Sequence, residues 1–142
     1  SNPDWEVLGL VRTAQPVPDL PDNVTLVPWG PQRALLEHAD VAVIHAGVAS
    51  VIECIEAEVP MLLYPQVNDQ QGNAARVAFH GLGLIGDHGD TALTLARQIT
   101  ELSRDKDVAR RLAEMHRRFD AAADDKALER AVATLANTGR LS

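Results

Sequence analysis

The chain has 142 residues, of which 46% are hydrophobic and 23% charged, and a formal net charge of −7. These values are typical of one soluble globular domain and exclude a disordered chain. The negative charge argues against a protein that binds nucleic acids or membrane surfaces through a positive field, and no apolar run reaches the ~20 residues of a membrane-spanning helix.

Short apolar runs alternate with longer helical patterns along the chain. The runs that predict strands are Trp5–Val11, Val24–Val27, Val41–Ile44, Met61–Tyr64 and Leu82–Ile85. Strands that alternate with helices predict right-handed crossovers and a parallel α/β sheet. The single cysteine, Cys54, lies in an apolar helical pattern, which indicates a small buried side chain.

Helices are predicted between these strands and through the C-terminal third. Before the fifth strand the expected helices are 31–38, Val48–Ala57 and 68–79. Three apolar stripes predict further helices: Leu95, Ile99 and Leu102; Val108, Leu112, Met115 and Phe119; and Leu128, Val132 and Leu135.

Helix ends carry recognisable signals. Asn68 and Gln71 form a pattern like a capping box, and Asp90 can cap the helix that follows it. Gly81 and Pro60 are suited to end the helices before them.

Polar or aromatic residues follow three consecutive predicted strands. Trp29 comes after the second strand, His45 after the third and Asp69 after the fourth. Ligands of open α/β sheets bind beyond the carboxyl ends of the strands. We therefore expect these three loops to form one site.

The stretch from His45 to Gly47 leaves a strand and enters a helix. Gly47 tolerates positive φ and close approach by other atoms. The N–H groups at the helix start, from Val48 onward, lack intrahelical partners and favour an anion by ~0.3–1 kcal/mol, and Ser50 adds a hydroxyl. The pattern predicts a diphosphate site; the alternative is a buried histidine, a turn glycine and a serine cap.

Trp29 is expected to stack on a nucleotide base, because it is held in a loop beside stiff neighbours. Gly30 can offer backbone to the base edge, Gln32 can reach a hydroxyl, and Glu53 can accept ribose hydroxyls from within an apolar helix face. The alternatives are a tryptophan that covers the core and a solvated glutamate. Asp69 and Gln70 can bracket sugar hydroxyls, or Asp69 can simply complement a helix start.

These residues form the pattern Trp-x-Pro-Gln at 29–32, His-x-Gly-x-x-Ser-x-x-Glu at 45–53, Val-Pro at 59–60 and Asp-Gln at 69–70. The pattern resembles the donor-binding segment of family-1 glycosyltransferases, the UDP-glycosyltransferase group, in its bacterial natural-product form. The resemblance runs from about residue 23 to residue 83 and departs at Ala49, often asparagine, and at Glu58, often glycine. It implies a Rossmann-like parallel sheet with flanking helices, the C-terminal half of a GT-B fold, with residues 1–142 as one nucleotide-sugar donor-binding domain.

The resemblance also assigns roles. It implies contacts to the nucleotide from Trp29, Gly30, Gln32 and Glu53; to the diphosphate from His45, Gly47, Val48 and Ser50; and to the donor sugar from Asp69 and Gln70. A hexose would pass from a UDP- or dTDP-sugar to an acceptor hydroxyl with inversion. No catalytic residue is expected in this chain, because the family's general base lies in an N-terminal domain, so the isolated chain is expected to be inactive. No metal or cofactor is expected either, since the five histidines show no helical pair or carboxylate cluster at ligand spacing.

The resemblance further implies a cytoplasmic enzyme fragment that lacks the first strand of its domain. The fragment could then complete its sheet by dimerisation or strand exchange, since unpaired strand edges attract partners. Two other functions stay open: an enzyme like the UDP-sugar epimerases, and a non-catalytic nucleotide-sugar-binding module that works with a partner subunit.

Overall fold

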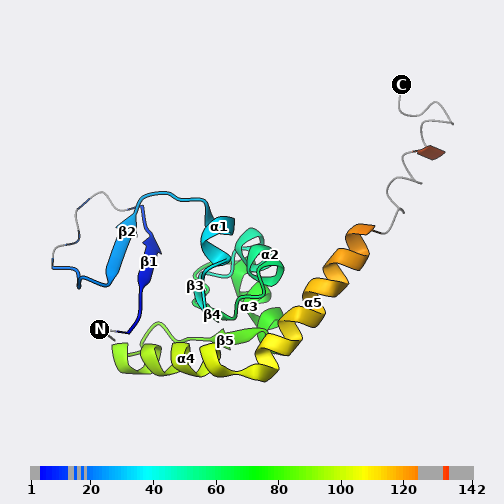
Figure 1. The fold of residues 1–142 in the computed structure, drawn as a ribbon. Helices are drawn as coiled ribbons and strands as arrows, with labels where there is room; N and C mark the ends of the chain where they lie inside the picture. The colour runs from blue at the N-terminus through cyan, green and yellow to red at the C-terminus, as the bar shows by residue number, and fades with distance from the viewer. Residues whose placement is uncertain (1–3, 13–14, 16, 18, 125–132, 135–142) are drawn as a thin grey trace.

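The computed structural model describes residues 4–12, 15, 17, 19–124 and 133–134. Within these residues five parallel strands are found, and from the second strand onward strands and helices alternate, as the sequence predicts (Figure 1). The strands are β1 (Val7–Leu10), β2 (Val24–Val27), β3 (Ala42–Ile44), β4 (Met61–Leu63) and β5 (Gly83–Ile85). The helices are α1 (Gln32–Leu36), α2 (Val48–Glu56), α3 (Asp69–Phe79), α4 (Ala92–Arg104) and α5 (Lys106–Asp124). The fourth predicted stripe falls on residues 128–135, outside the described residues except for 133–134.

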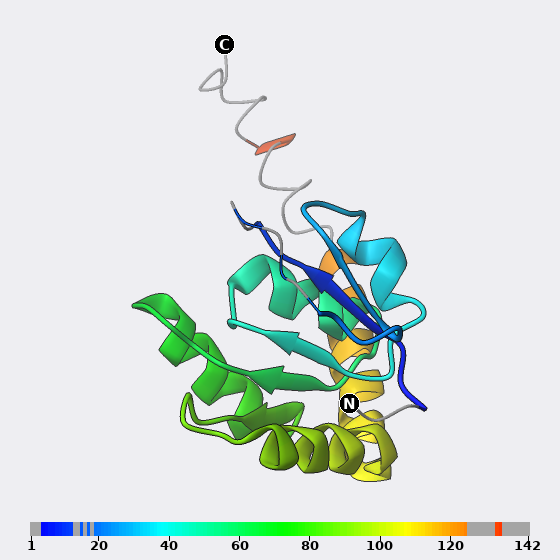
Figure 2. The same cartoon turned by 90° about the vertical axis from the view of Figure 1, so that its left-hand side faces the viewer.

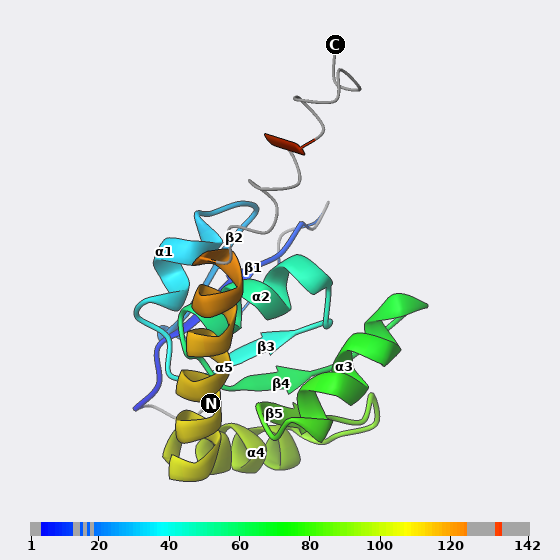
Figure 3. The same ribbon diagram turned by 90° about the vertical axis from the view of Figure 1, so that its right-hand side faces the viewer.

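The strands form two separate sheets. β1 pairs with β2, and β3, β4 and β5 pair in that order, all in parallel. Figure 3 shows β1 and β2 above β3, followed by β4 and β5, and Figure 2 shows the same order from the opposite side. The parallel order is therefore broken between β1 and β3.

The hydrophobic core lies around the three-stranded sheet. Helix α4 packs against β4 and β5 on one side, and α2 and α3 cover the other side, where α5 contacts α2 (Figure 1). Met61, Leu62 and Leu63 of β4 are fully buried because this central strand is covered on both faces. No residue of β1 or β2 belongs to the core.

The predicted stripes of α4 and α5 do face this core. Leu102, Val108 and Leu112 are buried, and Met115 and Phe119 pack against them. Cys54 of α2 is fully buried, as predicted; burial, and then the nearby carboxylate of Glu53, raise the pKa of its thiol to about 12. The thiol therefore stays protonated at neutral pH.

Two predicted caps are wrong. Asn68 precedes α3 with φ 41° and makes no capping hydrogen bond with its side chain. Instead Gln70 Oε1 accepts the N–H groups of Gln66 and Val67 at 2.9 and 3.2 Å. Thr91, rather than Asp90, caps α4, because Thr91 Oγ1 accepts the N–H of Thr94 at 3.2 Å.

Helices α2 and α3 end in the same kind of turn. The N–H groups of Gly81 and Leu82 bond back to Ala78 O and Val77 O at 3.0 Å each, with Gly81 in the left-handed region as predicted. Helix α2 ends before Pro60 in the same way, but its left-handed residue is Glu58, with φ 57°. The described residues include no helix long and apolar enough to cross a bilayer.

Candidate functional site

The loops after β3 and β4 meet at one end of the sheet. Asn73 of α3 donates its side-chain amide to the carbonyl oxygen of Ala46, between β3 and α2, at 3.0 Å. This bond holds the start of α3, with Asp69 and Gln70, beside the start of α2. The predicted diphosphate and sugar residues therefore lie on adjoining elements.

The turn from His45 to Gly47 differs in detail from the prediction. The residue with positive φ is Ala46, at 66°, whereas Gly47 has an ordinary φ of −62°. Ala46 is fully buried, and Asn73 fixes its carbonyl group. A Cβ at Gly47 would lie 2.7 Å from His45 Nε2, so the imidazole would have to shift to admit one. The imidazole of His45 thus lies directly against the helix start.

The start of α2 is open to an anion. Gly47 is the N-cap residue and provides no side-chain hydrogen bond, so no side-chain cap occupies the first N–H groups of the helix. Ser50 does not cap the helix either, and Val48 is 57% exposed. Backbone donors, the positive end of the helix dipole and an exposed imidazole at His45 therefore gather at one place.

Gln32, Ser50 and Glu53 form one hydrogen-bonded cluster. Gln32 Nε2 donates to Ser50 Oγ at 3.1 Å and to Glu53 Oε2 at 2.7 Å. The Ser50 oxygen accepts in this bond, so its hydroxyl proton is available to a ligand. Glu53 is half-buried, with a side-chain exposure of 22%, and is not a solvated helix residue.

Arg33, which the sequence interpretation did not include, joins this cluster. Its Nε lies 3.5 Å from Glu53 Oε1, and its terminal nitrogen lies 3.0 Å from Glu56 Oε2. Glu53 is therefore held by Gln32 on one oxygen and by Arg33 on the other. The sequence held a signal for Arg33, which follows Gln32 directly at the start of a helix. It also held one for Asn73, which lies one helical turn after Asp69.

The aromatic residue of the predicted site faces solvent. The Trp29 side chain is 80% exposed, so it does not cover the core. Gly30 lies between β1 and α1, where a Cβ would be 3.1 Å from Leu10 Cδ2 and 3.4 Å from Leu35 Cδ1. The backbone at Gly30, between Trp29 and Gln32, therefore packs closely against Leu10 and Leu35.

Asp69 is the exposed first residue of α3, and Gln70 is half-buried behind it. Because Gln70 Oε1 accepts two backbone N–H groups, its amide nitrogen remains a donor for a ligand. A carboxylate acceptor and an amide donor side by side suit a sugar with several hydroxyls.

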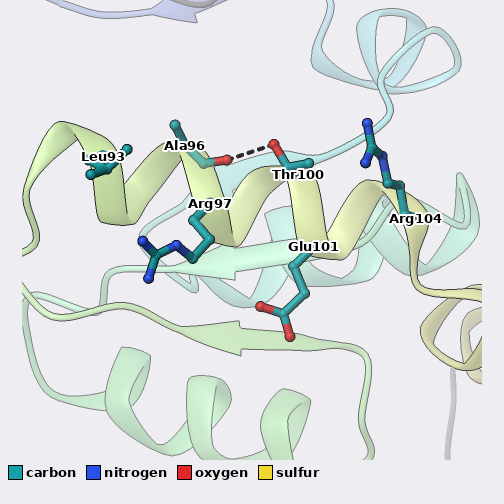
Figure 4. A pocket seen from close by; sticks show the side chains of 6 residues that line it. All are labelled: Leu93, Ala96, Arg97, Thr100, Glu101 and Arg104. Carbon is teal, nitrogen blue, oxygen red and sulfur yellow. Dashed lines mark hydrogen bonds between the residues drawn. The ribbon is translucent and has the colours of Figure 1, made fainter.

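Two hollows in the described surface lie away from these residues. One, of about 440 Å³, runs along α4, where Leu93 and Ala96 point to one flank and Arg97 and Glu101 to the other (Figure 4). The second, of about 270 Å³, lies near Phe79 and Arg111. None of the candidate site residues lines either hollow.

No three His, Cys, Asp or Glu side chains among the described residues come together in a way that could hold a metal ion.

A family model described as UDP-glucoronosyl and UDP-glucosyl transferase matches residues 5–133. The chain belongs to this family. The oleandomycin glycosyltransferase of Streptomyces antibioticus is 39% identical over 116 residues, which cover 78% of this chain and 26% of that protein. This family-1 glycosyltransferase chain thus spans about a quarter of the length of that relative.

Solved structures agree with this assignment. The glycotransferase of kitacinnamycin is 37% identical with a TM-score of 0.78, over 84% of this chain and 32% of that one. The glycosyltransferase VinC, solved in complex with dTDP, is 29% identical with a TM-score of 0.67, over 73% of this chain and 27% of that one. The parallel strands and flanking helices are therefore those of a GT-B glycosyltransferase, as the sequence predicts.

Proposed function

We propose that this chain is the donor-binding half of a hexosyltransferase that uses a UDP- or dTDP-sugar. The observation that carries the proposal is the hydrogen-bonded cluster of Gln32, Ser50 and Glu53 at the start of α2. The carboxylate of Glu53 is suited to accept ribose hydroxyls, and the hydroxyl of Ser50 lies beside the open backbone N–H groups of the helix. The exposed indole of Trp29 adds a surface for a base. That VinC was solved with dTDP supports a nucleoside diphosphate as ligand.

The proposed reaction is a direct displacement at the anomeric carbon with inversion. An acceptor hydroxyl, deprotonated by a base outside this chain, attacks as the bond to the diphosphate breaks and the electron pair leaves with the diphosphate. His45, Ser50 and the start of α2 stabilise the charge on this leaving group, while Asp69 and Gln70 orient the hexose. The acceptor is bound by residues outside the chain.

Calorimetric titration with UDP, dTDP, their glucose conjugates and uridine tests this proposal. We expect the diphosphates to bind more tightly than uridine, and Asp69→Asn to weaken binding of the glucose conjugates but not of UDP. Equal affinity for uridine and UDP would contradict a diphosphate site at the start of α2.

A further inference from the structure

The loop that follows β5, residues 86–90, is folded onto Tyr64 at the end of β4. One carboxylate oxygen of Asp90 accepts both the N–H of Asp87 and the hydroxyl of Tyr64, each at 2.9 Å. A Cβ at Gly86 would overlap the Tyr64 ring, so the glycine allows the backbone to lie against that ring. The loop is therefore closed on itself and fixed to the end of the neighbouring strand.

This loop places His88 against the segment that leads from β4 to the candidate sugar residues. His88 Nε2 lies 3.0 Å from the carbonyl oxygen of Pro65. Because a carbonyl oxygen can only accept, Nε2 carries the proton and donates it. The imidazole also packs against Tyr64, with the ring centroids 5.8 Å apart and the ring planes at 58°. His88 thus joins the loop after β5 to the loop after β4.

The segment between β4 and α3 is held from its other side by Gln70. The Oε1 atom of Gln70 accepts the backbone N–H groups of Gln66 and Val67, at 2.9 and 3.2 Å. His88 fixes the residue immediately before them, at Pro65 O. Three consecutive residues are therefore each held by a hydrogen bond to a side chain outside the segment.

Asn68, the residue before α3, has a strained backbone conformation. Its φ of 41° and ψ of −112° lie outside the regions that residues other than glycine favour. Such a conformation persists only where the surrounding structure imposes it. The hydrogen bonds of the three preceding residues impose it from one side, and the bond from Asn73 to Ala46 O holds α3 on the other. The positions of Asp69 and Gln70, which follow directly, depend on both.

We propose that His88 is a positioning residue for the donor sugar, which acts through the segment 65–68 on Asp69 and Gln70. This inference rests on the proposed function, from which it takes the contacts of Asp69 and Gln70 with the hexose. His88 does not itself touch the sugar. Its bond to Pro65 O sets the path of the backbone before α3 and, with it, the direction of the Asp69 carboxylate and the Gln70 amide.

The residues proposed to bind the nucleotide are held in a different way. Gln32, Ser50 and Glu53 lie on α1 and α2 and bond to one another. The bonds of His88 and of the Tyr64 hydroxyl instead connect the loop after β5 to the end of β4 and the loop that follows it. Loss of the bond from His88 should therefore disturb the contacts to the sugar and leave those to the nucleoside diphosphate intact.

The first measurement uses NMR and needs no nucleotide, so its outcome is separate from that of the proposed function. The backbone amides of Gln66 and Val67 and the side-chain amide of Gln70 report whether the segment is held. We expect His88→Ala to shift and broaden these signals. His88→Gln, which keeps an N–H donor on a side chain of similar reach, should restore them. His38→Ala removes an exposed histidine after α1 and is the control. The proposal is overturned if His88→Ala leaves the three signals as they are in the natural chain.

The second measurement is calorimetric titration of the same variants with UDP, dTDP and their glucose conjugates. We expect His88→Ala to bind the glucose conjugates about tenfold more weakly and the free diphosphates as before, and His88→Gln to recover most of the affinity. Equal losses for conjugates and free diphosphates, or no loss at all, would overturn a role in sugar binding. Failure of the proposed function shows instead in the natural chain, which would then bind UDP no more tightly than uridine, while the NMR comparison still decides whether His88 holds the segment.

Discussion

Gln32 Nε2 donates to Glu53 Oε2 at 2.7 Å and thereby links the start of α1 to helix α2. The same nitrogen bonds Ser50 Oγ at 3.1 Å. Three side chains from two segments are thus held in place before any ligand arrives. Such preorganisation reduces the ordering cost of binding and leaves the Ser50 proton and the remaining Glu53 lone pairs for the ligand.

We predict that Glu53→Gln weakens binding of UDP by about 10- to 100-fold, since hydrogen bonds to a charged group contribute roughly 1.5–3 kcal/mol. Binding of 2′,3′-dideoxy-UDP should change little, because it lacks the hydroxyls that Glu53 would accept. Calorimetry measures both affinities, and Glu56→Gln, which removes the other carboxylate partner of Arg33, is the control. Equal losses for the two ligands would show that Glu53 does not bind the ribose.

Trp29→Ala should weaken binding of UDP and UDP-sugars alike by roughly 1–3 kcal/mol, the value of one base-stacking contact. The melting temperature should stay the same, because the indole is 80% exposed. Phe79→Ala removes an equally exposed aromatic side chain at the far end of α3 and should affect neither property. Full affinity in Trp29→Ala would contradict base stacking.

The strands and their order of appearance could be predicted from the sequence, because β3 and β4 are short apolar runs between turn signals. Strand β2 has the predicted bounds, and the other four strands are one to three residues shorter than their apolar runs, since the end residues lie in loops. The assignment of Gln32, Ser50 and Glu53 to one site also came from the sequence. The hydrogen bonds show that these three side chains are in contact.

Turn conformations and distant partners could not be predicted in the same way. Ala46 and Glu58 have positive φ at the turns before and after α2. Local preferences disfavour this conformation for both residue types, so it is imposed by the surrounding packing. The contacts of Arg33 with Glu53 and of Asn73 with Ala46 O join segments that meet only in the folded chain. Sequence spacing carries no direct signal for such pairs.

Gly47→Ala should weaken UDP binding with little loss of stability. Alanine tolerates the φ of −62° at this position, but its Cβ would lie 2.7 Å from His45 Nε2 and force the imidazole away. If that displacement is the cause, Gly47→Ala should have no further effect on affinity in a His45→Ala background. Additive losses of affinity in this double-mutant cycle would mean that Gly47→Ala does not act by displacing His45.

The matched control for Gly47→Ala is Gly72→Ala. A Cβ at Gly72, within α3, meets no atom within 4 Å. Alanine favours helix over glycine by roughly 0.5–1 kcal/mol, so this variant should melt at a higher temperature and bind UDP normally.

Asn73→Ala should lower the free energy of unfolding by about 0.5–1.5 kcal/mol, the net value of one hydrogen bond, and weaken UDP binding by loosening the turn at Ala46. Asn73→Asp should be worse on both counts, because a carboxylate would face the Ala46 carbonyl oxygen that now accepts at 3.0 Å. Chemical denaturation and calorimetry measure the two effects, with the exposed Gln71→Ala as control. If Asn73→Asp kept the stability and UDP affinity of the natural chain, the bond from Asn73 to Ala46 O would not be the cause of the losses in Asn73→Ala.

The contact between α5 and the end of α2 should make stability depend on pH. His116 Nδ1 lies 3.0 Å from Glu58 Oε1, and His116 Nε2 lies 3.5 Å from Asp120 Oδ2. The hydrogen bond to Glu58, followed by the charges of Asp120, Glu58 and Glu56, raises the pKa of His116 above 6.5, although partial burial opposes the shift. The stabilisation is therefore fully present below pH 6.5 and is lost as the pH rises through the raised pKa.

We accordingly expect the difference in melting temperature between the natural chain and His116→Gln to be largest near pH 6 and to shrink toward pH 8.5. His80→Gln, which alters a ring packed on Phe79 at the exposed end of α3, is the control and should show no such trend. Thermal unfolding from pH 5.5 to 8.5 measures this difference while Glu58 stays ionised. A difference that is constant or grows with pH would mean that the His116–Glu58 contact contributes through packing and not through charge.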